Sequence, residues 1–312
     1  MRILVVGAGA IGGYFGGRLL QAQQDVTFLV RARRAAELAA SGLEIRSRLG
    51  DAAIPQPPTV LAEDLHAAFD LILLSCKAYD LESAIDALAP AVGPQTLILP
   101  LLNGMRHLDL LDQRFGPAHV LGGLCIISVT LEPGGRVTHF NNVDQLVFRE
   151  RDGSLSARAE AIAAVFSRAS FQSRLSPSIL QEMWEKWVFI AACAGVTCLM
   201  RAPIGDIAAG GAAPFALALL DECAAIAASH GYPPRPEPLQ QSRAALTRAG
   251  SSMVASMFRD IERHAPVEVE HLIADLLRRG EAHSIDAPTL RLACAHLQTY
   301  EARRLREASA KQ

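Results

Sequence analysis

Short apolar runs alternate with stretches of helical periodicity along the first half of the chain. Apolar runs bounded by turn residues predict buried strands, and the periodic stretches between them predict crossover helices. The predicted strands cover residues 3–6, 26–30, 71–75, 96–99 and 120–130, and the predicted helices cover residues 12–21, 34–41 and 81–89. This order indicates a doubly wound, mostly parallel α/β sheet with right-handed crossovers.

The pattern that follows the last of these strands differs. A turn at Gly134 and Gly135 leads into strand-like runs at residues 137–140 and 145–148. Two short runs after such a turn are typical of antiparallel strands. We expect them to complete the same sheet.

Beyond Phe171 the periodicity is helical throughout. Ser176, Pro177 and Ser178 precede Gln181 with the spacing of a capping box, which predicts a helix start. We therefore expect an α/β domain at residues 1–174 followed by an all-α domain at residues 175–312. The polar end, residues 307–312, is expected to fray.

Composition restricts the possible partners and cellular setting. The 312 residues are 50% hydrophobic, enough for two domains with large cores, and the formal net charge of −2 excludes a basic field for nucleic acid. The six cysteines lack metal-ligand spacing, which predicts free thiols in a reducing cytoplasm and no metal site. Residues 187–200 form an apolar run too short to span a membrane, so we expect a buried helix in the core or at a homodimer interface.

The first predicted strand runs directly into a G-x-G-x-x-G sequence that opens a helix. In this motif the first glycine allows the turn, the second lets backbone amides approach a pyrophosphate, and the third lets the helix pack closely. The alternative is that the glycines only make a tight turn. We interpret the motif as a Rossmann-type dinucleotide site formed by Gly7, Ala8, Gly9, Ala10, Ile11 and Gly12.

The end of the second predicted strand indicates which dinucleotide binds. An NAD site places a carboxylate there for the ribose 2′-hydroxyl, but this strand ends in Arg31, with Arg33 and Arg34 close behind. Arginine binds phosphate bidentately, so we expect NADPH, with Arg31 at the 2′-phosphate and Arg33 or Arg34 in support. The alternative is an exposed basic helix start.

Two more strand ends carry polar residues. Lys77 follows the strand at residues 71–75, and Asn103 follows the strand at residues 96–99. Ligands of open α/β sheets bind at the carboxyl ends of strands, so both residues are candidates for the cofactor edge. Taken singly, each is equally well explained as an ordinary loop residue.

In the helical half, Lys186 interrupts a stripe of apolar residues. A buried lysine can give up a proton near neutral pH, but Glu182 lies one turn earlier and would make an ordinary helical ion pair. Glu268, after Pro266, has the position of a carboxylate at a helix start, and Ser256 has the character of a small polar helix residue. Periodicity alone does not assign these three residues.

Taken together and in order, these motifs resemble those of the ketopantoate reductase (2-dehydropantoate 2-reductase) family over nearly the whole chain. The matching segments are Gly7–Gly12, Arg31, Ser75–Ala78, Leu102–Met105, Trp184–Trp187, Ser256–Ile261 and Val267–Glu270. The resemblance implies that Lys186 is the general acid and that Ser256 contacts the substrate. It also implies that Asn103 places substrate and nicotinamide, and that Glu268 hydrogen-bonds within the closed ternary site.

On the cofactor side, the resemblance implies that Lys77 and the backbone near Ser128 border NADP(H). The chain departs from the family where asparagines usually follow the catalytic lysine, because Ile190 and Ala194 stand there, and Ile204 replaces a third. A substrate hydroxyl that loses an amide partner costs about 1–3 kcal/mol. The substrate therefore need not be ketopantoate.

The expected activity is NADPH-dependent reduction of a small 2-oxo acid to a 2-hydroxy acid, with ketopantoate or a close analogue as substrate. Lys186 would protonate the developing alkoxide while domains hinged near residue 174 close over both ligands. The alternatives are a related NADP-dependent hydroxy-acid or opine-type dehydrogenase and an NADPH-binding sensor without turnover. A sensor would need none of Lys186, Ser256 and Glu268.

Overall fold

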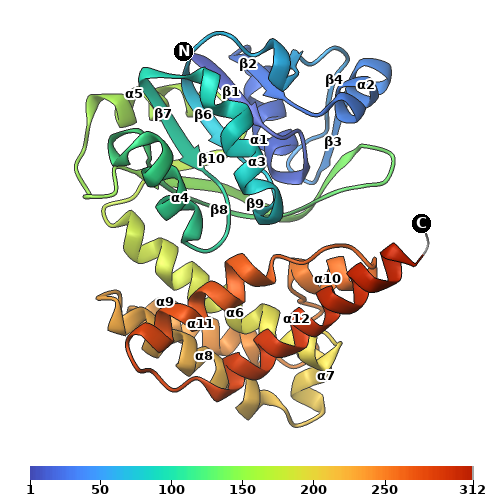
Figure 1. Ribbon diagram of the computed structural model, residues 1–312, viewed down its shortest axis with the longest axis vertical. Helices are drawn as coiled ribbons and strands as arrows, with labels where there is room; N and C mark the ends of the chain where they lie inside the picture. The colour runs from blue at the N-terminus through green and yellow to red at the C-terminus, as the bar shows by residue number, and fades with distance from the viewer. Residues whose placement is uncertain (311–312) are drawn as a thin grey trace. The chain divides into compact units, whose positions relative to one another are not determined.

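The computed structural model describes residues 1–310, which divide into two compact units. Unit 1 comprises Met1–Leu102 and His107–Ile179, and unit 2 comprises Asn103–Arg106 and the chain from Leu180 onward. In Figure 1, blue to green segments build the sheets of unit 1, and yellow to red segments build the helices of unit 2. Two features of this division are not visible in the sequence: unit 1 continues past residue 174 to Ile179, and four residues after the 96–99 strand belong to unit 2.

The first sheet of unit 1 is entirely parallel, with strand order β5-β2-β1-β6-β7. Its strands are β1 (Arg2–Val6), β2 (Asp25–Leu29), β5 (Thr59–Val60), β6 (Phe69–Leu74) and β7 (Val92–Pro100). The strand order reverses at β1, because β2 lies on one side of it and β6 on the other. Such a reversal is the switch point at which doubly wound sheets bind ligands. The predicted fold class, a parallel α/β sheet followed by a helical domain, is confirmed.

Five helices accompany the strands of this half of the chain. They are α1 (Ala10–Gln21), α2 (Ala32–Ser41), α3 (Leu81–Leu88), α4 (Arg106–Phe115) and α5 (Ala157–Phe166). Helix α1 is glycine-rich because both its faces are packed: a Cβ at Gly16 would lie 2.6 Å from the Phe28 ring, and one at Gly17 2.6 Å from Ile45. Phe28 belongs to the first sheet and Ile45 to a second sheet, so α1 is packed between the two.

The second sheet corrects the expectation that antiparallel strands complete the first one. Its strands are β3 (Leu43–Ser47), β4 (Ala52–Ile54), β8 (Gly122–Leu131), β9 (Val137–Arg149) and β10 (Gln172–Leu175). Strand β9 is one continuous strand instead of two short runs, since β8 pairs with it on one side and β3 and β10 on the other. The pairing partners β3 and β10 were not predicted, and β10 interrupts the run expected to be helical after Phe171.

All the regular secondary structure in the described part of unit 2 is helical. Its helices are α6 (Ile179–Met200), α7 (Ile204–Ala209), α8 (Ala213–Ser229), α9 (Pro236–Leu246), α10 (Ser256–Glu262), α11 (Asp275–Ala282) and α12 (Pro288–Ser309). A π-helical turn, η5 (Glu270–Ala274), leads directly into α11. Helix α12 continues to Ser309, so the fraying expected from residue 307 is wrong as far as the structure describes the chain; residues 311–312 lie outside it.

Helix α6 provides much of the core of unit 2. By length and composition it could cross a membrane, but 72% of its most apolar window is buried, as in the core helix of a globular protein. The helix begins at Ile179, close to the predicted start. The capping box is not formed, because the Ser178 N–H donates to the Ser176 Oγ at 3.0 Å, and the Gln181 amide donates to the Pro233 carbonyl and to Glu185.

Candidate active site

The glycine loop after β1 has the geometry of a phosphate cradle. Gly7 has a φ of 92°, and a Cβ at Gly12 would lie 2.0 Å from the Gly7 carbonyl oxygen and 2.2 Å from the Ser75 Oγ. At Gly9, which precedes the first residue of α1, a Cβ would meet no atom within 4 Å. The first and third glycines are thus required by the turn and its packing, while Gly9 borders open space at a helix N-terminus, where an anion is stabilised.

Two side chains from other segments hold this loop in shape. The Ser75 hydroxyl, directly after β6, donates to the carbonyls of Val6 and Gly7 at 2.9 and 3.2 Å. The Arg34 guanidinium donates to the Ala8 carbonyl at 3.0 Å and to the Gly135 carbonyl at 3.1 Å, and only 13% of its side chain is exposed. Arg34 is therefore committed to the loop itself.

Arg31 lies beyond the end of β2, as predicted, with 73% of its side chain exposed. Its Nη2 lies 2.6 Å from the Asp80 Oδ1, and this hydrogen bond raises the pKa of Arg31 above its ordinary value. The sequence shows no acid at the end of β2, but the structure brings one there from the loop after β6. Arg33 is 90% exposed and lies 3.4 Å from Glu37.

Of the two remaining predicted cofactor residues of unit 1, one follows a strand of the first sheet and the other lies in the second sheet. Lys77 is half-buried in the loop after β6, immediately before the short 3₁₀ turn that ends at Asp80. Ser128 belongs to β8 of the second sheet, next to a register shift, and its backbone N–H donates to the Asn141 Oδ1 at 3.3 Å. Lys77 thus shares the edge of the first sheet with the glycine loop, while the Ser128 amide is used within the second sheet.

In unit 2, Lys186 lies on α6 among the apolar residues that the sequence predicts. Met183, Trp187 and Ala194 are at most 4% exposed, but Lys186 itself is half-buried, as is Ile190. Of the two alternatives that the sequence leaves open, a fully buried lysine is excluded and a partly exposed one is found. Lys186 therefore has apolar neighbours on α6 and is partly exposed to solvent.

Trp187 links α6 to the π-helical turn. Its indole Nε1 donates to the Leu272 carbonyl at 2.8 Å, and the side chain is completely buried. A π-turn widens the helix and disturbs the usual backbone ladder, so a buried carbonyl there gains from an outside donor. Glu268 immediately precedes this helical segment, and its carbonyl accepts the Leu272 N–H at 2.9 Å. Lys186 thus precedes Trp187 in the sequence, and Glu268 is hydrogen-bonded to Leu272, the partner of Trp187.

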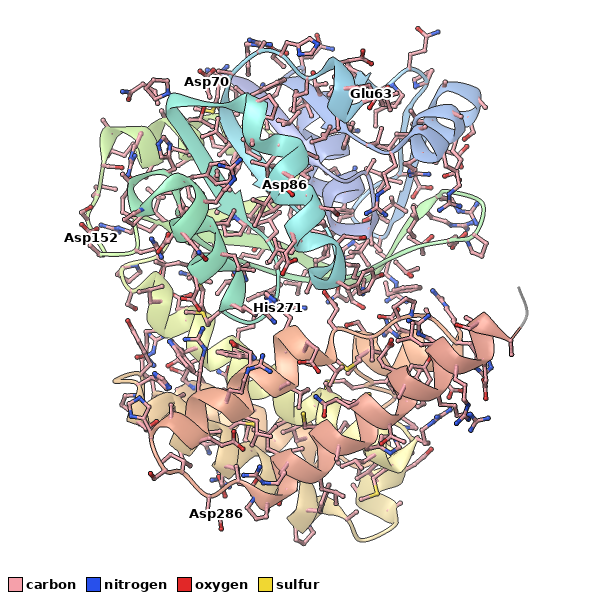
Figure 2. All side chains as sticks on the ribbon, viewed as in Figure 1. Glu63, Asp70, Asp86, Asp152, His271 and Asp286 are labelled. Carbon is pink, nitrogen blue, oxygen red and sulfur yellow. The ribbon has the colours of Figure 1, made fainter. Side chains whose placement is uncertain are left out.

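His271 in the π-turn, labelled in Figure 2, hydrogen-bonds to the backbone of Asn103. Burial lowers the pKa of His271, while Glu268, Asp275 and a hydrogen bond to the Asn103 backbone raise it. Because that bond favours the charged ring, the imidazole is the donor and the Asn103 carbonyl the acceptor. A Cβ at Gly104 would lie 3.0 Å from the His271 carbonyl. The sequence analysis did not identify His271, because its hydrogen-bond partner Asn103 lies 168 positions earlier in the sequence.

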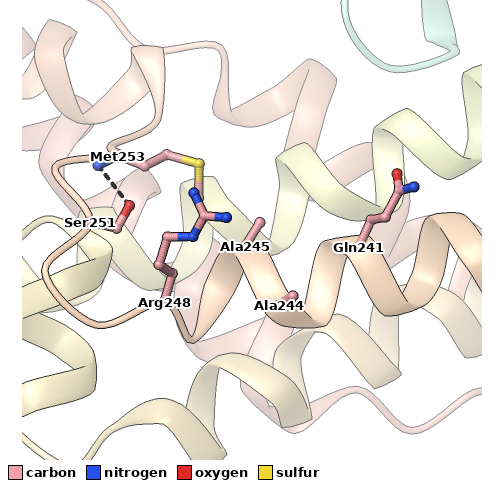
Figure 3. Close-up of a pocket in the computed structure, with 6 residues that line it drawn as sticks. All are labelled: Gln241, Ala244, Ala245, Arg248, Ser251 and Met253. Atoms are coloured by element: carbon pink, nitrogen blue, oxygen red, sulfur yellow. Dashed lines mark hydrogen bonds between the residues drawn. The ribbon is translucent and has the colours of Figure 1, made fainter.

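Ser256 is the exposed first residue of α10. The preceding residue, Ala255, donates its N–H to the Thr197 Oγ1 of α6 at 3.4 Å, so α6 also anchors the start of α10. The loop before it borders a pocket of about 270 Å³, drawn in Figure 3. Its lining residues are Gln241, Ala244, Ala245, Arg248, Ser251 and Met253. None of the predicted site residues lines this pocket, which is smaller than typical ligand sites.

Comparison with known proteins identifies the family. One family model, described as ketopantoate reductase PanE/ApbA, matches residues 3–153, and the model of its C-terminal region matches residues 178–301. The chain belongs to the ketopantoate reductase family. An uncharacterized oxidoreductase of Bacillus subtilis, YkpB, is 37% identical over 97% of this chain and 99% of its own.

Solved structures agree on the fold. A 2-dehydropantoate 2-reductase from Geobacter metallireducens has a TM-score of 0.88 and 26% identity, covering 96% of this chain and 99% of its own. A D-mandelate dehydrogenase with NADH and anilino(oxo)acetate has the same TM-score at 21% identity, covering 97% and 99%. Ketopantoate reductases are oxidoreductases, and this chain has their two-part architecture.

Three aliphatic residues stand where the resemblance implies asparagines, and the structure buries them to different depths. Ala194 is 1% exposed and Ile204 is completely buried, whereas Ile190 is half-buried. Ala194 and Ile204 are therefore parts of the core of unit 2. Ile190, one turn after Lys186 on α6, is the replacement with access to solvent.

The cysteines and lysines of the chain further define which chemistry is available. All six cysteines are free thiols, and within residues 1–310 no group of His, Cys, Asp or Glu could hold a metal ion. Lysine occurs at only three of the 30 positions that carry Lys or Arg, and two of these are Lys77 and Lys186. Arginine cannot give up its proton in proteins, whereas lysine can. Two of the three lysines of the chain thus stand at predicted site positions.

Proposed function

We propose that the protein is an NADPH-dependent reductase that converts a small 2-oxo acid into the corresponding 2-hydroxy acid. The observation that carries the proposal is the cradle after β1: a turn at Gly7, open space at Gly9, and a phosphate-binding residue type, Arg31, at the end of the neighbouring strand. Membership of the ketopantoate reductase family supports the reaction type.

NADPH, when bound, supplies the hydride for the substrate's carbonyl carbon. The Lys186 ammonium stabilises the negative charge that develops on the carbonyl oxygen and donates a proton from Nζ to that oxygen. The half-buried position of Lys186 on α6, beside the buried residues Met183 and Trp187, strengthens this interaction by lowering the local polarity.

The other predicted residues bind and orient the reactants. Asn103 and Ser256 hydrogen-bond the substrate, Glu268 completes the hydrogen bonding around it, and Lys77 borders the cofactor. His271 is a positioning residue, because its imidazole holds the Asn103 carbonyl.

We propose 2-dehydropantoate or a close analogue as substrate. Ile190 favours a second candidate, a 2-oxo acid whose side chain is apolar near this position, since an aliphatic residue cannot pair with a substrate hydroxyl. A hydroxy-acid dehydrogenase of this kind would use the same cradle and the same lysine.

The test is a panel of 2-oxo acids, including 2-dehydropantoate, pyruvate and phenylglyoxylate, with NADPH consumption followed at 340 nm. We expect at least one rapid substrate, and a loss of about 10²–10⁴-fold in kcat for Lys186→Ala. Lys186→Arg is the sharper variant: it keeps the charge but cannot transfer the proton, so activity should stay low. Tight NADPH binding without turnover of any acid would favour a sensor, and wild-type turnover in Lys186→Ala would refute the acid role.

A further inference from the structure

The Arg31–Asp80 ion pair lies where the strands of the first sheet have their carboxyl ends, beside the glycine loop. Arg31 follows β2 and Asp80 follows β6, and these two strands flank β1 in the parallel sheet. Their carboxyl ends therefore meet on either side of the glycine loop that follows β1. The 2.6 Å contact between the Arg31 Nη2 and the Asp80 Oδ1 joins the two flanking loops.

The pair is accessible and able to open. The Arg31 side chain is 73% exposed and the Asp80 side chain 32% exposed. Exposed ion pairs are weak and are readily exchanged for other partners. A guanidinium has five N–H donors in a planar fork, so Arg31 can bind a further anion while Asp80 still occupies one donor.

Asp80 changes the charge that this edge offers to a ligand. Arg31 alone would present one positive charge to a ribose 2′-phosphate, but the adjacent carboxylate cancels much of it and repels the phosphate. A carboxylate is, conversely, the group with which NAD sites accept the ribose 2′-hydroxyl. Arg31 thus favours NADPH, and the neighbouring Asp80 favours NADH.

We propose that Asp80 is a specificity-determining residue that weakens the preference of the site for NADPH and lets it accept NADH. The inference rests on the proposed dinucleotide site. NADPH and NADH differ only at the ribose 2′ position, which is where the negative charge of Asp80 acts. Removal of this charge should therefore change the ratio of the two affinities more than the affinity for the rest of the cofactor.

The test uses two fragments that differ only at the 2′ position, adenosine 2′,5′-bisphosphate and 5′-AMP, titrated calorimetrically against the full-length protein. Asp80→Asn should strengthen binding of the bisphosphate about fivefold and leave 5′-AMP unchanged or weaker. Arg31→Gln should weaken the bisphosphate about tenfold or more and spare 5′-AMP. Glu82→Gln is the matched control: it removes an exposed carboxylate two residues away in α3 and should change both affinities less than twofold.

The outcomes separate this inference from the proposed function. If Asp80→Asn weakens the bisphosphate, Asp80 orients Arg31 for phosphate and the inference is wrong. If Asp80→Asn and Glu82→Gln have equal effects, only net charge matters and the inference is also wrong. If the wild type binds neither fragment, NADPH nor NADH, the proposed function itself fails. Should Asp80→Asn not fold, Asp80→Ser removes the same charge and the same outcomes apply.

Discussion

Alanine substitutions at two glycines of the same loop should affect different properties. Gly12→Ala should lower the stability of the fold, and Gly9→Ala should weaken cofactor binding. In Gly12→Ala, the new methyl would lie 2.0 Å from the Gly7 carbonyl oxygen and 2.2 Å from the Ser75 Oγ, about 1.5 Å inside ordinary contact distance. The loop must move, which costs about 1–3 kcal/mol in overpacking and about 1 kcal/mol more if a Ser75 hydrogen bond is lost.

Gly9→Ala is the matched comparison, because its methyl would meet no atom within 4 Å and its φ of −82° suits any residue. The free energy of unfolding should stay within about 1 kcal/mol of wild type, since alanine restricts the unfolded chain. The methyl would project from the backbone that approaches the pyrophosphate, so NADPH affinity should fall at least about tenfold, a loss of about 1.4 kcal/mol.

The assay pairs thermal unfolding without cofactor with a fluorescence titration of NADPH. For Gly12→Ala we expect a fall in Tm of about 5–10 °C. For Gly9→Ala we expect an unchanged Tm and weak binding. Wild-type NADPH affinity in Gly9→Ala would refute the assignment of the cradle, and a wild-type Tm in Gly12→Ala would refute the packing argument.

Two buried titratable groups should make stability depend on pH in different windows, measured by urea unfolding of each variant beside the wild type. His271 has a pKa lowered mainly by burial, so the unfolded chain binds a proton more readily; the stability of wild type relative to His271→Gln should fall as pH drops below about 6.5. Glu185 has a pKa lowered, against the effect of its burial, by hydrogen bonds from Arg235 and Gln181. Glu185→Gln should cost about 1–3 kcal/mol at neutral pH, and this difference should shrink as pH falls below about 4.3, through the lowered native pKa.

Each of these variants is the control for the other. A stability difference for His271→Gln that is constant from pH 7 to pH 5 would contradict the burial of a neutral imidazole. For Glu185→Gln, the argument fails if the difference persists unchanged below the native pKa.

Local patterns predicted those features that depend on local chemistry. The glycine loop, Arg31 and the stripe around Lys186 could be predicted because turn geometry and helical spacing involve residues close in sequence. Asp80 was missed as a partner of Arg31 because the pair forms only when two parallel strands on either side of β1 bring their ends together. Knowledge of the strand order would have been enough to find it.

The second sheet was missed for a related reason. β9 looks like two short runs because its middle residues are polar, and only its pairing with three other strands makes it continuous. The sequence left the burial of Lys186 open because a helical stripe indicates which side faces the core and not how deep it lies. Strand pairing and depth of burial depend on tertiary packing, which the local pattern of a sequence does not reveal.

The membership of Asn103–Arg106 in unit 2 bears on how the protein can be dissected. The polypeptide passes between the units three times, so no single cleavage point yields two intact halves. A fragment beginning at Leu180 would lack the Asn103 carbonyl that pairs with the His271 imidazole and the glycine packed against that turn. It would have to be supplied with residues 103–106 as a grafted loop or a synthetic peptide before its helices could be expected to keep their native arrangement.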